Sequence, residues 1–87
     1  MEEKALKEFK LLYFGKLTVY SDRVEIKYLF KNEIISAKKI ANVSHHKISG
    51  KFIIETTGGS QTIIYLIGGW KVDEEAMRLI TSLNIPS

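Results

Sequence analysis

The sequence predicts an α+β fold, in which about seven short antiparallel strands are followed by one C-terminal helix. Polar and apolar residues alternate strictly from Arg23 to Tyr28, as in a strand with one buried face. Turn signals such as Gly58-Gly59-Ser60 separate further segments of this kind, and such short connections favour antiparallel pairing. The stretch 73–83 has helical periodicity, and a helix there would cover the open side of the sheet.

The first 13 residues suit two structures. Ala5, Leu6 and Phe9 share one helical face, and Glu3 and Lys7 have the i, i+4 spacing of a helical ion pair. The aromatic stretch that follows is equally suited to the beginning of a strand. We favour a short helical start that runs into a strand.

The remaining chain is expected to form strands separated by turns. A hairpin turns at Ser21-Asp22, and the segment Gln61–Ile67 is apolar on both faces, so we expect it to be central in its sheet or covered on both sides. Ala37–Ile40 is expected to be a connection. The expected strands are Leu17–Tyr20, Arg23–Tyr28, Glu33–Ser36, Ala41–Lys47, Lys51–Thr57 and Gln61–Ile67.

The C-terminal helix is predicted to begin with Asp73 as its N-cap, because a side-chain oxygen there can accept from free N–H groups of the first turn. Glu74 and Glu75 then place negative charge at the positive end of the helix dipole. Trp70 is expected to close the core where the helix meets the sheet, and the alternative is an exposed anchor. The apolar stripe that faces the core comprises Ala76, Ile80 and Leu83.

The composition suits a single domain over residues 1–87, because a chain of this length has room for one core. There is no cysteine, which excludes disulfides, thiolate metal sites and a cysteine nucleophile. The N-terminus mixes acidic and basic residues, unlike a signal peptide, and no run approaches the roughly 20 apolar residues that cross a bilayer. We therefore expect a cytoplasmic chain that is not transmembrane, alone or as a module of a larger protein.

No grouping of side chains indicates catalysis. His45 and His46 are adjacent, and adjacent residues of a strand point to opposite faces, so they would not bind one metal ion together. We expect one to be half-buried and the other exposed. Gly58-Gly59-Ser60 and Gly68-Gly69 do not match a phosphate-binding loop, and turn formation explains them. The prediction is a protein that is not an enzyme and that holds no cofactor and no metal.

The net charge of +3 is small, but the positive charge is concentrated in the middle of the chain. If the lysines there converge, they form a patch for anionic headgroups or phosphates. The alternative is that scattered lysines keep a small β domain soluble and protect its strand edges. Four lysines and no acidic residue fall between Glu33 and Glu55, namely Lys38, Lys39, Lys47 and Lys51.

The order of these segments resembles a known family. The strand Gly15–Tyr20, the Ser21-Asp22 turn and the strand Arg23–Tyr28 are similar to the first hairpin of a bacterial pleckstrin-homology-like (PH-like) or GRAM-like domain. The step Ile40-Ala41-Asn42-Val43 is similar to the beginning of the fourth strand in that family, and the 52–66 hairpin with the helix completes the likeness. The resemblance implies a PH-like split barrel of about seven strands capped by the C-terminal helix, with a non-enzymatic binding role.

The same resemblance bears on lipid binding. Family members that bind phosphoinositides carry basic residues in the loop between their first two strands. Here that loop resembles Ser21-Asp22, which is short and contains an acid. The resemblance therefore implies that the usual headgroup pocket is missing.

Three functions follow, in order of preference. The first is a non-catalytic module that acts by protein–protein contact or self-association through unpaired strand edges. The second is weak peripheral binding to anionic membrane lipids through Lys38, Lys39, Lys47 and Lys51. Nucleic-acid binding ranks last, because the aromatic residues that would stack on bases do not interleave with these lysines. Those aromatic residues are Tyr13, Phe14, Tyr20 and Tyr28.

Overall fold

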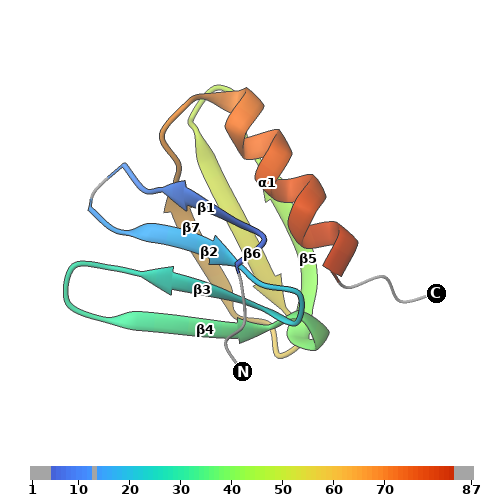
Figure 1. The fold of residues 1–87 in the computed structure, drawn as a ribbon. Helices are drawn as coiled ribbons and strands as arrows, with labels where there is room; N and C mark the ends of the chain where they lie inside the picture. Colours follow the sequence, from blue (N-terminus) through green and yellow to red (C-terminus); the bar gives the residue numbers. More distant parts are fainter. Residues whose placement is uncertain (1–4, 13, 84–87) are drawn as a thin grey trace.

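The structure, a computed structural model, describes residues 5–12 and 14–83. They form two antiparallel sheets and a C-terminal helix (Figure 1), so the α+β class predicted from sequence is confirmed. The first sheet has the order β1-β2-β3-β4 and the second has the order β5-β6-β7. The elements are β1 (Lys7–Lys10), β2 (Lys16–Val19), β3 (Arg23–Lys27), β4 (Asn32–Ser36), the 3₁₀ turn η1 (Ala37–Lys39), β5 (Ile40–His45), β6 (Lys51–Thr56), β7 (Gln61–Tyr65) and α1 (Trp70–Leu83).

The alternation of the strands builds one core between the two sheets. In β3, Val24 and Ile26 are fully buried, while their neighbours along the strand point outward. The register places Leu17 of β2 opposite Ile26, so that buried side chains lie beside one another. Phe52 of β6 joins the same cluster from the second sheet. Burial of each such side chain contributes about 1.5–3 kcal/mol to folding.

The two sheets meet at one corner, where Leu11 forms an isolated bridge with Leu66. Beside it, the N–H of Leu12 donates to the carbonyl of Tyr65 at 2.8 Å. Within residues 5–12 and 14–83, neither sheet closes on itself.

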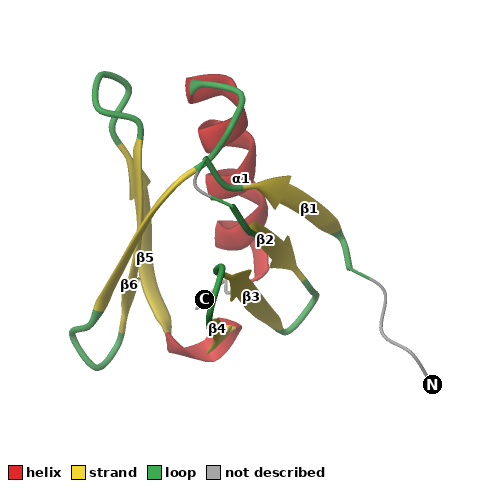
Figure 2. Ribbon diagram, turned by 90° about the vertical axis from the view of Figure 1, so that its left-hand side faces the viewer, coloured by secondary structure: helices red, strands yellow, loops and turns green. Residues whose placement is uncertain are grey.

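Helix α1 covers the opening between β1 of the first sheet and β5 of the second (Figure 2). Ala76 and Ile80 of the helix are fully buried, and Lys7 of β1 forms an ion pair with Glu75 of the helix. Residues 5–12 and 14–83 contain no helix with the length and apolar content that a bilayer crossing needs.

The predicted start of the helix is wrong, because α1 begins at Trp70 rather than at Asp73. The carbonyl of Gly69 accepts from the N–H groups of Val72 at 3.1 Å and Asp73 at 3.2 Å, so helical bonding begins before Asp73. Asp73 therefore lies in the first turn and is only 2% exposed. Burial raises the pKa of its carboxyl group, and the nearby charge of His45 partly opposes this.

Trp70 also differs from expectation. Its side chain is 42% exposed, and the Lys47 ammonium lies 4.4 Å from its ring centroid. This contact is a cation–π interaction between the β5–β6 turn and the beginning of the helix. Trp70 therefore ties the helix to a turn at the surface rather than closing the core.

The N-terminal segment contains a strand, and the predicted helical start is wrong over the described residues 5–12, while Tyr13 and residues 1–4 lie outside them. Phe9 is 5% exposed and lies opposite Leu17 in the β1–β2 ladder. Pairing with β2 thus outweighs the local helical pattern. The added strand also moves the first loop: it is the turn 11–15, whereas Ser21-Asp22 joins the second strand to the third.

β7 was expected to be central in its sheet or covered on both sides, and both expectations are wrong. It is an outer strand of the three-stranded sheet. Ile64 is buried, but Ile63 is 46% exposed and Ile67 just beyond the strand is 50% exposed. The alternation is regular, and apolar residues on the solvent face concealed it in the sequence.

Candidate functional site

The predicted lysines do not come together as one patch. Lys38 and Lys39 belong to η1, which leads into β5. Lys47 and Lys51 lie past the other end of β5, in the following turn and at the first position of β6. A strand rises by about 3.3 Å per residue, so the length of β5 separates the two pairs.

The adjacent histidines are placed as expected, with His45 half-buried and His46 exposed. Among the residues that the structure describes, no three His, Asp or Glu side chains gather as a metal ion would require. The buried Nδ1 of His45 and Oδ1 of Asp73 have no hydrogen-bond partner within this part of the chain.

The aromatic residues considered for base stacking are also dispersed. Tyr13 lies outside the described residues. Tyr20 is half-buried, and the Arg23 guanidinium lies 4.1 Å from its ring centroid at the β2–β3 turn. Phe14 and Tyr28 lie together at the opposite end of the sheet.

This opposite end is the candidate site. Two turns project there side by side: 11–15 joins β1 to β2, and 28–31 joins β3 to β4 (Figure 1). They expose Phe14 (74%), Leu29 (63%) and Phe30 (92%), which we call the apolar tip. A single exposed apolar side chain is ordinary, whereas a group on neighbouring turns marks an interaction surface.

Three lysines lie across the sheet beside this tip. Lys10 of β1 is the cross-strand partner of Lys16 of β2, and Lys16 is the partner of Lys27 of β3. We call these three residues the lysine row. Like charges directly opposite one another in a sheet are destabilising, so packing gives no reason for this arrangement. An anion bound between the ammonium groups would remove the repulsion.

Intramolecular partners neutralise little of this charge. The Lys16 ammonium lies 3.6 Å from a carboxylate oxygen of Glu8, with both side chains about half exposed. Lys10 and Lys27 form no ion pair within the described residues. Lys31, at the end of the second turn, adds a fourth ammonium 5.0 Å from the ring centroid of Tyr28.

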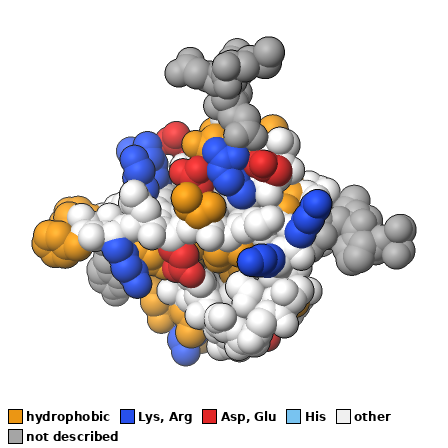
Figure 3. All heavy atoms as spheres, turned by 90° about the horizontal axis from the view of Figure 1, so that it is seen from below, with side chains coloured by type: hydrophobic (Ala, Val, Ile, Leu, Met, Phe, Trp, Pro, Cys, Tyr) orange, Lys and Arg blue, Asp and Glu red, His pale blue; other side chains and the backbone are white. Residues whose placement is uncertain are grey.

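The surface between the turns is hollowed. A cavity of about 520 Å³ is bordered by the lysine row together with Phe14, Leu29 and three other residues. A second cavity of about 210 Å³ continues between the sheets toward Ile63 and Tyr65, and Phe14 borders both cavities. In Figure 3, hydrophobic side chains project at the left-hand end of the molecule, with Lys or Arg side chains beside them. The remaining residues around the first cavity are Glu8, Gly15 and Tyr28.

The first turn has an unusual backbone. Phe14 has a φ of 64°, in the left-handed region that bulky residues seldom occupy. Gly15 follows with a φ of 127°, and a Cβ atom there would overlap the carbonyl oxygen of Lys27. The turn is thus packed closely against β3, and this conformation directs an aromatic side chain into solvent. Strained residues of this kind concentrate at functional sites.

A polar network supports the end of the sheet from within. The Glu33 carboxylate of β4 accepts from the Thr62 hydroxyl of β7 at 2.9 Å and from the Tyr28 hydroxyl at 3.2 Å. Burial, then the charge and hydrogen bond of Glu33, raise the pKa of Tyr28 to about 12. The Tyr28 hydroxyl is therefore a neutral donor at physiological pH, and it holds the second turn in place.

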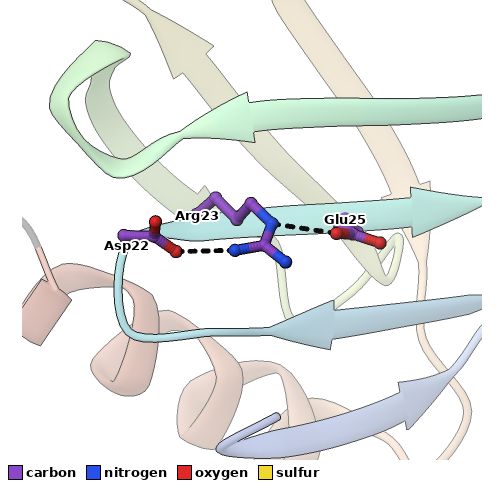
Figure 4. A network of polar contacts seen from close by, with 3 residues as sticks. All are labelled: Asp22, Arg23 and Glu25. Carbon is purple, nitrogen blue, oxygen red and sulfur yellow. Dashed lines mark hydrogen bonds and ion pairs between the residues drawn. The ribbon is translucent and has the colours of Figure 1, made fainter. Parts of the chain in front are cut away.

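The charged residues at the other end of β3 are satisfied by one another (Figure 4). Arg23 donates from Nε to Glu25 at 2.9 Å and from a terminal nitrogen to Asp22 at 2.9 Å. Its side chain is 25% exposed and covers Tyr20. Among the residues that the structure describes, the β2–β3 turn at this end exposes no apolar side chain, and the strand partners there are not like charges.

Sequence reasoning missed the apolar tip and the lysine row. Each projecting turn is flanked by lysines, Lys10 and Lys16 around the first and Lys27 and Lys31 around the second, and this local signal was present in the sequence. Counting acids and bases over long segments concealed it. No family model, curated protein or solved structure matches this chain.

Proposed function

We propose that this chain is a non-catalytic PH-like module that attaches peripherally to anionic membranes through the lysine row and the apolar tip. The observation that carries the proposal is the in-register row of Lys10, Lys16 and Lys27 beside exposed apolar turns. Ammonium groups would meet lipid phosphates and carboxylates while the tip enters the interface. The module would act in the cytoplasm, where the facing leaflet is anionic.

The fold supports the resemblance on which the family proposal rests. Seven antiparallel strands in two sheets, followed by one helix, agree with a PH-like split barrel in strand order and in the position of the helix. The position of the loop between the first two strands is the strongest of these supports. Because β1 precedes it, the loop 11–15 between the first two strands is flanked by Lys10 and Lys16, and the reason for expecting no headgroup pocket disappears.

The expected strength is moderate. A lysine near an anionic surface contributes about 1 kcal/mol, so the row with Lys31 supplies about 4 kcal/mol. Burial of an exposed Phe or Leu side chain adds about 1.5–3 kcal/mol. With one such side chain buried, the sum of about 5.5–7 kcal/mol corresponds to reversible attachment with a dissociation constant of roughly 10–100 µM. The membrane function therefore moves ahead of protein contact, and the lysines that carry it differ from those first predicted.

Vesicle co-sedimentation at low salt tests this proposal. Vesicles of phosphatidylcholine with phosphatidylserine should bind the chain, and vesicles of phosphatidylcholine alone should bind it weakly. The triple variant Lys10→Glu, Lys16→Glu, Lys27→Glu should lose binding by at least about 100-fold, because each reversal removes one attraction and adds one repulsion.

A matched control has the same change of charge elsewhere. The triple variant Lys38→Glu, Lys39→Glu, Lys51→Glu should keep most of the binding, since these residues lie outside the lysine row. Equal loss in both variants would mean that net charge alone drives attachment. Full binding by the first variant would refute the proposed site.

A further inference from the structure

The outer edge of β4 is an open strand edge. Within the part of the chain that the structure describes, β4 pairs with β3 alone. Other outer strands are better protected: β1 carries charged residues along its length, α1 packs on β5, and β7 ends in the bridge to Leu11. β4 is the lowest strand in Figure 1.

The hydrogen bonds of the β3–β4 hairpin identify which backbone groups are free. The N–H of Tyr28 donates to the carbonyl of Lys31, and the N–H of Ala37 donates to the carbonyl of Asp22. In an antiparallel ladder such pairs recur at every second residue. The backbone groups of Glu33 and Ile35 therefore face β3, and those of Asn32, Ile34 and Ser36 point away from it.

This edge lacks the features that usually prevent strand pairing. The sequence of β4, NEIIS, contains no lysine and no proline. Its one charged side chain, Glu33, is held by Tyr28 and Thr62 on the inner side. On the outer side, Ile34 is 64% exposed at the middle of the strand. A cavity of about 530 Å³ lies between β4 and the β6–β7 turn, with Lys39 also at its border.

We propose that two copies of this chain associate by pairing β4 with β4, antiparallel and centred on Ile34, to form one continuous sheet. In this register Ile34 lies opposite the partner's Ile34, and Asn32 lies opposite the partner's Ser36. Each of these positions points its N–H and carbonyl outward, so all of them form hydrogen-bonded pairs. No like charges lie opposite one another, which makes the edge complementary to itself.

The symmetry of the pairing limits the assembly to a dimer. A two-fold contact uses the same edge on both copies, so no β4 edge remains for a third chain. The lysine row lies on β1, β2 and β3, and the apolar tip lies on the turns 11–15 and 28–31, so neither includes a residue of β4. The short strand buries little area, so the dimer should form at roughly 10–100 µM chain.

Sedimentation velocity over a concentration series up to the order of 1 mM tests the dimer. The sharpest variant is Ser36→Pro. Ser36 has a φ of −63° and a ψ of 139°, which proline adopts without strain, and its N–H is one of the groups that point away from β3. The variant should remain folded by circular dichroism and sediment as a monomer throughout.

Ile34→Lys gives a second test, with Ile48→Lys as its control. Lysine at the two-fold axis would oppose its own copy and should weaken the dimer at least about tenfold. Ile48 is fully exposed on the β5–β6 turn, and the same change there should leave the dimer intact. A wild-type chain that is monomeric at the highest concentration would overturn the proposal. So would a dimer that survives Ser36→Pro or Ile34→Lys.

Discussion

At one end of the four-stranded sheet, Arg23 is held between Asp22 and Glu25 and covers the ring of Tyr20. At the other end, Lys10, Lys16 and Lys27 stand in register with one weak carboxylate contact among them. Strand β3 supplies a residue to each end, Arg23 to the first and Lys27 to the second. The charges at the first end form ion pairs within the molecule, whereas the ammonium groups at the second end have one weak carboxylate contact among them.

The apolar and aromatic residues of the turns follow the same division. Phe14, Leu29 and Phe30 lie at the lysine end, while the aromatic ring at the Arg23 end is half-buried beneath a guanidinium. Stability alone favours satisfied charges and covered rings, and the Arg23 end has both. The lysine end departs from both preferences at once. Such local departures are expected where a surface serves binding rather than folding.

The largest effect should come from adding a methyl group at the lysine end. Gly15→Ala should lower the free energy of unfolding by more than about 3 kcal/mol, because the new Cβ overlaps the Lys27 carbonyl and the φ of 127° is unfavourable for alanine. Gly59→Ala is the matched control, since its φ is 91° and nothing lies within 4 Å of an added Cβ. The free energy of unfolding of this control variant should fall by about 1–2 kcal/mol. Urea unfolding measures both, and equal losses would show that the turn is not packed against β3.

Removal of Glu33 should have the next largest effect. Glu33→Ala leaves the buried Thr62 hydroxyl without its acceptor and should cost about 1–3 kcal/mol in urea unfolding. Burial, the largest cause of the raised Tyr28 pKa, remains in this variant, but the charge and hydrogen bond of Glu33 are lost, so this pKa should fall below about 12. An NMR titration of the tyrosine ring carbons would follow it. An unchanged Tyr28 pKa would contradict the proposed support of the second turn.

The smallest effects on stability are expected from substituting one residue at each end of the sheet. Arg23→Thr should lower the free energy of unfolding by about 1 kcal/mol, because two carboxylates and a ring lose their partner. Lys27→Thr should raise it by a few tenths of a kcal/mol, since it relieves repulsion within the lysine row. Thermal unfolding at low salt measures the direction of both changes in stability. A destabilising Lys27→Thr would mean that the row is part of the stabilising structure.

Much of the fold was predictable because strand alternation and turn signals are local. The hairpin around Ser21-Asp22 and the strands near Glu33–Ser36 and Lys51–Thr56 follow from a two-residue period and short turns. The N-terminal strand was not predictable in this way. Its helical pattern is local, and the pairing of Phe9 with Leu17 that overrides it is a contact across a turn.

The candidate site depends on register, which a single sequence does not display. Lys10, Lys16 and Lys27 are separated along the chain and become neighbours only when three strands align. Lys38, Lys39, Lys47 and Lys51 are closer in sequence, yet a full strand separates them in pairs. Similarly, the helix began early because the carbonyl of Gly69, rather than a capping side chain, accepted the first N–H groups.

The measurement that most directly tests the contrast between the two ends is an amide NMR titration with nanodiscs containing phosphatidylserine. Signals from the turns 11–15 and 28–31 and from the lysine row should shift or broaden, while those around Arg23 should stay unchanged. Perturbations centred on Lys38–Lys51 or on the Arg23 end, or an absence of perturbations at low salt, would contradict a membrane site at the lysine end.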